Sequence, residues 1–151
     1  MIRIKPHHFI DIIKLYGTGI EVFVPDENMG HDFYKVANLL IAHPHHAIQL
    51  TIGMDDICQP CRMCKNGHCL DSFHLVDSFD SKESYNQLLD ERILSYYHLN
   101  LEETYSGYEL CTILFEHHHY IYDIWQEENQ IITKKRHNFF QIGSQKYLND
   151  V

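Results

Sequence analysis

The spacing of the cysteines is the feature of this sequence that most constrains its fold. Four of the five cysteines follow one another as C-x2-C-x2-C-x4-C, from Cys58 to Cys69. They lie in a stretch, residues 54–73, without helical or strand periodicity, and so long a structureless stretch is unusual in a compact domain unless something holds it. Two intervening residues allow a tight turn to aim two sulfur atoms at one centre, and Gly67 permits the positive φ that would return the fourth. The pattern therefore predicts one metal ion or cluster bound by Cys58, Cys61, Cys64 and Cys69.

Two kinds of centre compete for these four sulfurs. The beginning of the pattern matches the C-x2-C-x2-C run of bacterial ferredoxins, although four residues precede Cys69 instead of three and no proline follows it. Zinc prefers separated C-x2-C pairs or a mixture of cysteine and histidine ligands, so His68 is the alternative ligand of a Cys3His site. Unbound or disulfide-bonded cysteines are disfavoured, because the number of cysteines is odd and no secretion signal is evident. On spacing alone we favour a [4Fe–4S] cluster with a redox or accessory role. The alternative is a structural zinc site in a protein that acts through protein–protein contact.

Length and charge bound the class of protein. The 151 residues correspond to a single domain, 1–151. The net charge of −9 disfavours binding to nucleic acid or to an anionic membrane, because both require positive charge on the protein. The longest apolar runs, such as residues 37–42, are far shorter than the about 20 residues that span a bilayer, and no signal peptide is evident. We therefore expect a cytoplasmic protein with an unidentified redox or protein partner.

Apolar residues at helical spacing predict a predominantly helical α+β fold. The expected helices begin at Pro6, at residue 28 or 32, at about residue 81 and at the capping box Ser106–Glu109, and they end near residues 16, 43, 98 and 128. Residues 47–53 alternate as a strand, and residues 20–27 form either a short edge strand or an extended loop. The tail after about residue 130 is poorly patterned. One or two short strands and a long, metal-tethered cysteine loop complete the prediction.

Three segments together resemble a known family. They are residues 3–9 (Arg-Ile-Lys-Pro-His-His-Phe), the element Asp56-Ile57-Cys58-x2-Cys61, and Gly67-x-Cys69. These segments resemble a family of small bacterial and archaeal proteins that is catalogued as a domain of unknown function with suggested iron–sulfur binding. The resemblance spans roughly residues 2–75 and implies metal or cluster binding, without an established reaction.

The sequence departs from the usual pattern of that family in two places. Many members carry a cysteine where Asp11 stands here, and many carry further C-terminal cysteines where this chain has only Cys111. Cys64 is a candidate local replacement for one of these sulfurs. The departures leave open whether three or four cysteines bind, and therefore whether one iron would be exposed to a substrate.

Two adjacent histidines, His7 and His8, are the candidate catalytic residues. In a first helical turn their side chains point about 100° apart, which disfavours binding of both to one metal. One of them could complete a Cys3His site. If only three sulfurs bound a cluster, an open iron could act as a Lewis acid with His7 or His8 as the acid–base partner, which would make the protein an enzyme for a small substrate. The alternative is that neither histidine has a functional role, and that one is packed in the interior while the other is exposed to solvent.

Other polar residues have simpler expected roles. We expect Asp55 and Asp56 to cap the cysteine loop with their carboxylates. His117–His119 are expected to lie on a partly exposed polar helix face, and Cys111 is expected to be a small core residue.

Overall fold

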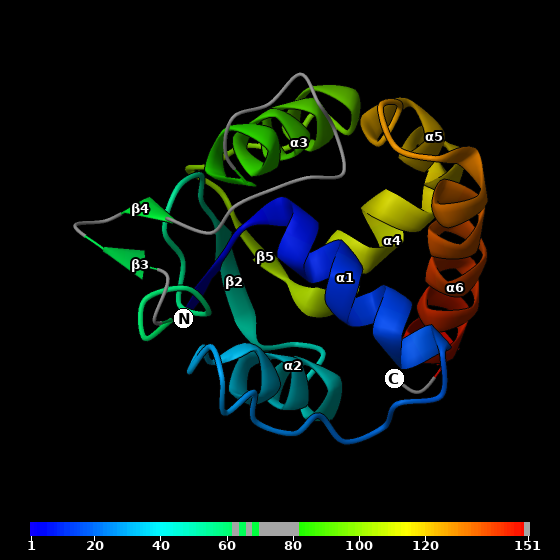
Figure 1. Ribbon diagram of the computed structural model, residues 1–151. Helices are drawn as coiled ribbons and strands as arrows, with labels where there is room; N and C mark the ends of the chain where they lie inside the picture. The colour runs from blue at the N-terminus through cyan, green and yellow to red at the C-terminus, as the bar shows by residue number, and fades with distance from the viewer. Residues whose placement is uncertain (62–63, 66–67, 70–81, 150–151) are drawn as a thin grey trace.

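The computed structural model describes residues 1–61, 64–65, 68–69 and 82–149. The elements are, in chain order, β1 (Ile2–Ile4), α1 (Pro6–Gly17), α2 (Phe33–Ala42), β2 (Ala47–Leu50), β3 (Cys64–Lys65), β4 (His68–Cys69), α3 (Lys82–Tyr96), β5 (Thr104–Ser106), α4 (Gly107–Glu116), the 3-10 helix η1 (His118–Tyr120), α5 (Ile121–Ile124) and α6 (Gln130–Asn149). Figure 1 shows α1 in the centre of the view, with α3 above it, α6 beside it and α2 below.

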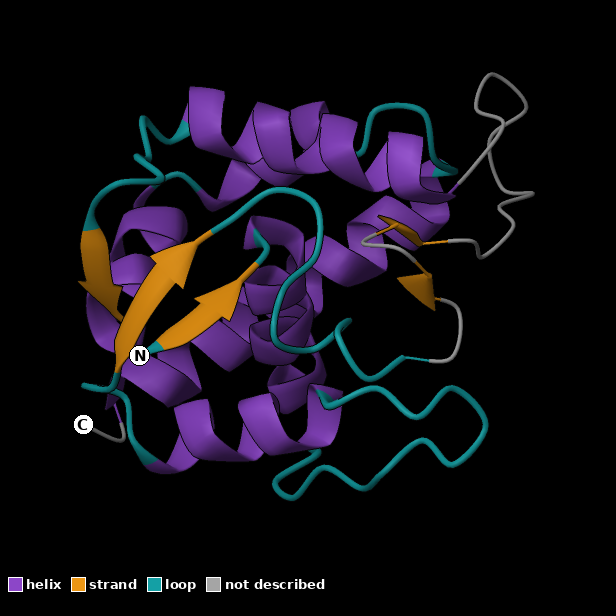
Figure 2. Cartoon of the chain, turned by 90° about the vertical axis from the view of Figure 1, so that its left-hand side faces the viewer, coloured by secondary structure: helices purple, strands orange, loops and turns teal. Residues whose placement is uncertain are grey.

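A small three-stranded sheet has the order β1-β2-β5, with β2 in the middle (Figure 2). β1 and β2 are parallel and β2 and β5 antiparallel, and the chain reaches β2 from β1 through α1 and α2, as a parallel pair requires. The register pairs Ile2 with Ile48 and Ile4 with Leu50. All four side chains are buried, because residues two apart on a strand point to the same face. The sheet therefore presents one apolar face to the core.

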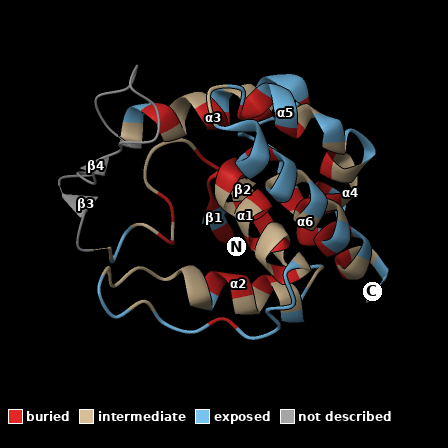
Figure 3. Ribbon diagram, turned by 45° about the vertical axis from the view of Figure 1, so that its right-hand side comes forward, coloured by how far each residue is buried: buried red, intermediate tan, exposed pale blue. Residues whose placement is uncertain are grey.

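The helix α1 packs most extensively against α6. Buried residues lie along α1 and the sheet, whereas the outer surfaces of α5 and α6 are exposed (Figure 3). The two helices approach each other at Gly17 and Gly143. A Cβ atom at Gly143 would overlap the carbonyl oxygen of Ile13, and one at Gly17 would overlap that of Phe139. The absence of side chains at these glycines therefore allows the backbones to touch.

The longest helix, α6, lies in the poorly patterned tail after about residue 130, for which the sequence predicts no helix or strand. The buried positions of α6 do recur at helical spacing, but small or polar residues occupy most of them. These buried residues are Thr133, Phe140, Gly143, Ser144 and Tyr147. Apolar periodicity cannot reveal a helix whose inner face is built for close backbone contact.

The predicted single helix over residues 107–128 is wrong, because the chain breaks after α4. His117 leaves the helical conformation, with φ −130° and ψ 48°. Its carbonyl accepts hydrogen bonds from the hydroxyl of Tyr97 (2.8 Å) and from the backbone N–H of Tyr120 (3.0 Å). These bonds stand in place of a continued α-helical bond, and the chain turns through η1 into α5.

Most of the other local predictions are confirmed. Helices α1, α2 and α3 and strand β2 lie within or close to the predicted ranges. The Ser106 hydroxyl accepts the N–H of Glu109 (3.0 Å), as the capping box predicts. Residues 20–27 form a loop. The side chain of Asn38, from α2, holds this loop by accepting the backbone N–H of Phe23 and donating to its carbonyl.

The fold class is confirmed as α+β and predominantly helical. The sequence missed β1, β5 and the two-residue strands β3 and β4. None of the helices in the described ranges combines the length and the apolar character that a bilayer span requires.

We expect Gly143→Ala to destabilise the protein by about 3 kcal/mol, because the added methyl group would force α6 away from α1. Urea denaturation measures the change. Gln145→Ala, at an exposed position of the same helix, is the matched control and should change stability by less than about 0.5 kcal/mol. Equal stability of the two variants would contradict the close approach of α1 and α6.

Candidate metal centre

The candidate centre lies where the first turn of α1 meets the loop that follows β2. His7 and His8 belong to α1, with Lys5 directly before it, and Asp55 and Cys58 belong to the loop. Pro6 at the first helical position suits the helix start, because proline has no N–H that needs a partner there. Lys5, His7 and Asp55 are buried, and His8 and Cys58 are half-buried. Such a concentration of buried titratable groups is typical of functional sites.

Asp55 holds the loop and the helix together. Its Oδ1 accepts the backbone N–H groups of Ile57 (3.1 Å) and Cys58 (3.0 Å). Its Oδ2 accepts the backbone N–H of Lys5 (2.8 Å) and contacts Nδ1 of His8 at 2.7 Å. The predicted capping role of Asp55 is therefore confirmed, and the same carboxylate also fixes the start of α1.

The charge state of Asp55 determines which ring nitrogen of His8 carries the proton. Burial by itself raises the pKa of Asp55, but the hydrogen bonds from His8 and from the backbone of Lys5 and Cys58 hold this pKa well below its usual range. An ionised carboxylate can only accept, so Nδ1 of His8 carries the proton of their hydrogen bond. Burial and the neighbouring His7 lower the pKa of His8, and Asp55 offsets this only in part. His8 is therefore a neutral imidazole whose Nε2 keeps its lone pair.

His7 forms a second histidine–carboxylate pair, with Asp90 of α3. Oδ1 of Asp90 lies 2.8 Å from both the backbone nitrogen and Nδ1 of His7. Burial by itself lowers the pKa of His7, but Asp90 more than offsets it, and the pKa is raised. Oδ2 of Asp90 is buried and accepts no hydrogen bond from the described part of the chain. The rings of His7 and His8 lie 4.4 Å apart, yet each is held by a different carboxylate, in agreement with their predicted divergence.

Cys58 is a protonated thiol in this environment. Burial and the carboxylate of Asp55 raise the pKa of Cys58 to about 12, and the nearby ammonium group of Lys5 offsets them only in part. A thiol with so high a pKa is a poor nucleophile, because the thiolate is the reactive form. A metal ion would change this, since coordination deprotonates the thiol.

Three donor atoms of different kinds converge here. One ring nitrogen of His8, one carboxylate oxygen of Asp55 and Sγ of Cys58 all lie within 4.8 Å of one another. Among the described residues this is the one group of three such side chains close enough to hold a metal ion. The arrangement is thus a possible metal site that contains a predicted sulfur ligand and one of the two predicted histidines.

The structure places the other predicted ligands as follows. Cys58 and Cys61 carry free thiols, and a turn joins them through the bond from Cys61 N–H to the carbonyl of Cys58 (2.9 Å). The backbone of Cys64 in β3 pairs with that of Cys69 in β4, and Lys65 with His68. The two short strands run antiparallel (Figure 2).

Several other predictions concern parts of the chain that the structure does not describe. The side chains of Cys64, His68 and Cys69 lie outside the described set, as does the predicted turn residue Gly67. The predicted cap of α3, at Ser81 or the residue before it, also lies there. Their roles stay predictions.

Sequence reasoning missed Lys5 and Asp90. Asp90 had a detectable signal, because it lies three and seven residues before Ile93 and Tyr97, on the buried face of α3, and a carboxylate on such a face needs a partner. Lys5 had no signal, since strand alternation after Ile4 would point it outwards. Cys111 is fully buried, as predicted.

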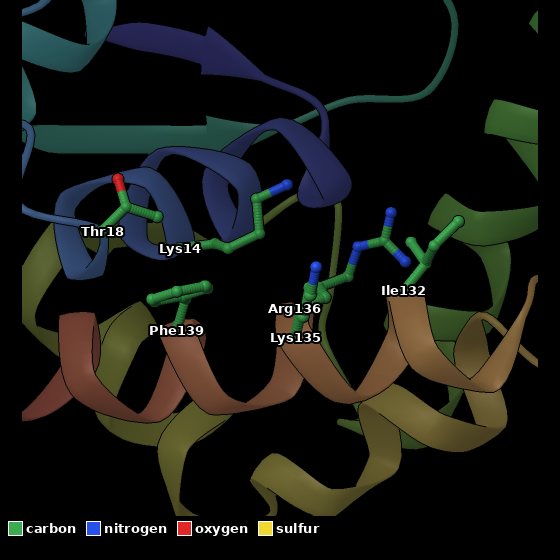
Figure 4. A pocket seen from close by; sticks show the side chains of 6 residues that line it. All are labelled: Lys14, Thr18, Ile132, Lys135, Arg136 and Phe139. Carbon is green, nitrogen blue, oxygen red and sulfur yellow. The ribbon is translucent and has the colours of Figure 1, made fainter.

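A pocket of about 180 Å³ lies elsewhere, between α1 and α6. It is lined by Lys14, Thr18, Ile132, Lys135, Arg136 and Phe139 (Figure 4). Two of its three cations already have acidic partners, Lys14 with Asp11 (3.6 Å) and Arg136 with Glu128 (3.2 Å). The lining includes no thiol, imidazole or carboxylate. We therefore place the candidate chemistry at the group of His8, Asp55 and Cys58, the Asp55 cluster.

Comparison of the chain with protein-family models, with curated proteins and with solved structures finds no match.

We expect Asp55→Asn to lower the free energy of unfolding by about 3 kcal/mol at pH 7, because the amide nitrogen cannot accept the N–H of Lys5. The low pKa of Asp55 means that its stabilisation is present above about pH 4 and is lost as the pH falls further. The difference between wild type and variant should therefore shrink in acid. Urea denaturation from pH 7 to pH 3 measures both effects.

Asp56→Asn is the matched control. Asp56 is half-buried and its side chain accepts one N–H, that of Arg3 (2.9 Å), which an asparagine oxygen can also accept. We expect a change below about 1 kcal/mol. If Asp55→Asn costs no more than this control, Asp55 does not anchor the loop as described.

Proposed function

We propose that this chain is a metal-binding protein whose centre is built on Cys58 and His8 and completed by sulfur atoms of the cysteine loop. The observation that carries the proposal is that a ring nitrogen of His8 and Sγ of Cys58 lie within 4.8 Å of each other, beside the carboxylate of Asp55. Two of these residues come from the loop and one from α1. A metal at this point would therefore tie the long cysteine loop to the helical body of the protein.

Zinc is the ion that this donor set favours. Both oxygens of Asp55 already accept two hydrogen bonds each, so its role as the partner that orients His8 is favoured over direct ligation. Histidine ligands commonly donate their second ring N–H to a carboxylate in this way. The remaining donors are imidazole and thiolate, the combination typical of closed zinc sites. His8, Cys58, Cys61 and either Cys64 or Cys69 would make up a Cys3His set.

A [4Fe–4S] cluster is the second candidate, and the C-x2-C-x2-C spacing favours it. In that case Cys58, Cys61, Cys64 and Cys69 are the ligands, and His8 is a neighbour. The family that the sequence resembles points the same way. The neighbouring ammonium of Lys5 would offset part of the negative charge of such a cluster, and an electron-transfer or accessory role would follow.

Nucleophilic catalysis by Cys58 alone is a poorer account of the same residues. Its pKa of about 12 leaves almost no thiolate at neutral pH. The two histidine–carboxylate pairs can hold protons, but in the described part of the chain neither pair lies beside an activated thiol. The histidines therefore support metal binding better than a hydrolytic triad.

Anaerobic purification with analysis of zinc, iron and acid-labile sulfide tests the proposal. We expect about one zinc per chain to stay bound at this centre through purification, and we expect His8→Ala to weaken zinc binding there at least about tenfold, because a ligand is lost. Cys58→Ser should weaken binding similarly. Cys111→Ala, which removes a core thiol on another element, is the matched control and should keep the full metal content.

The same measurements separate the two candidates. A brown protein whose iron and sulfide survive His8→Ala but not Cys64→Ser would establish a four-sulfur cluster in place of zinc. Reduced wild-type protein that takes up neither zinc nor an iron–sulfur cluster would overturn the proposal as a whole.

A further inference from the structure

A second group of imidazoles lies away from the Asp55 cluster, where η1 meets α6. Nδ1 of His118 lies 2.8 Å from Nε2 of His137. His118 belongs to η1 and His137 to α6, and both side chains are half-buried. The break of the chain after α4 creates this contact, because η1 then lies against α6.

The two rings are held in place by their neighbours. The ring of Phe115 lies 5.5 Å from that of His118, and the ring of Tyr122 lies 4.9 Å from that of His137. The side-chain amide of Gln141, one turn after His137 on α6, contacts Nε2 of His118 at 3.3 Å. Both imidazoles are thus oriented by packing and by a polar partner, and no ligand is needed to bring them together.

The distance between the two nitrogens, 2.8 Å, is only slightly shorter than that between two ligands on one ion. Metal–nitrogen bonds of about 2.0–2.1 Å place adjacent ligand atoms roughly 2.9–3.4 Å apart, so a shift of a few tenths of an ångström would admit the ion. A contact of 2.8 Å also requires at least one ring to be neutral, because two protonated imidazoles have no acceptor. Binding of an ion at both contact nitrogens would move the proton of the contact to the far nitrogen of the ring that carries it, so that both rings stay neutral and each presents a lone pair to the ion.

We propose that His118 and His137 bind a divalent ion of the imidazole-preferring class, with Zn²⁺ as the representative. Imidazole suits zinc, copper and nickel, whereas calcium and magnesium prefer oxygen ligands. Water completes the coordination on the half-exposed side. The ion links η1 to α6, and the site shares no residue with the Asp55 cluster.

Zinc titration of the wild-type protein and of His137→Gln tests this site. We expect isothermal titration calorimetry to show one zinc equivalent fewer in His137→Gln than in wild type. Zinc binding at the Asp55 cluster should be the same in both proteins. His43→Gln, which changes an exposed histidine just after α2, is the matched control and should bind as many equivalents as wild type. Equal stoichiometry in wild type and His137→Gln would overturn the proposal.

A measurement on the unmodified protein identifies the ligand atoms. Zinc should shift the ¹⁵N resonances of Nδ1 of His118 and Nε2 of His137 in histidine-ring NMR spectra, and should leave the ring nitrogens of His43 in place. Unshifted resonances of both nitrogens at saturating zinc would show a simple hydrogen-bonded pair and would sink the proposal. This NMR measurement does not depend on the folding of a variant, nor on which metal is bound at the Asp55 cluster.

Discussion

The arrangement of the candidate centre depends on one buried carboxylate. Asp55 accepts hydrogen bonds from the loop that carries Cys58 and from the first turn of α1, where His8 lies. A buried, ionised carboxylate is costly unless its acceptor positions are filled, and here both oxygens are filled by groups from the two segments. The requirement to satisfy this charge therefore holds a thiol and an imidazole near each other, although 50 residues of sequence separate them.

The packing of α6 and α3 against α1 also holds this arrangement in place. The contact at Gly17 and Gly143 draws α6 against α1, and α3 contributes Asp90, whose carboxylate bonds the N–H and ring of His7. The start of α1 is thus held by the loop through Asp55 and by α3 through Asp90. With its backbone fixed at both points, the first turn presents His7 and His8 in defined directions, which a binding site requires.

Local patterns could be read from the sequence where one element is sufficient to explain them. Pro6, the capping box at Ser106 and the alternation after Ala47 each act within a few residues, and each was confirmed. The helix α6 could not be read, because threonine, glycine and serine occupy three of the five buried positions on its inner face. The break at His117 could not be read either, since its carbonyl bonds a hydroxyl group, that of Tyr97, from the turn just after α3.

The sequence by itself determined that four cysteines are concentrated between residues 58 and 69 and that two histidines begin a helix, because both features are local in the chain. Tertiary structure alone decided which histidine faces the thiol. Helical geometry turns neighbouring side chains about 100° apart, so the choice depends on which carboxylate lies on each side. Asp55 from the loop selected His8, and Asp90 from α3 selected His7.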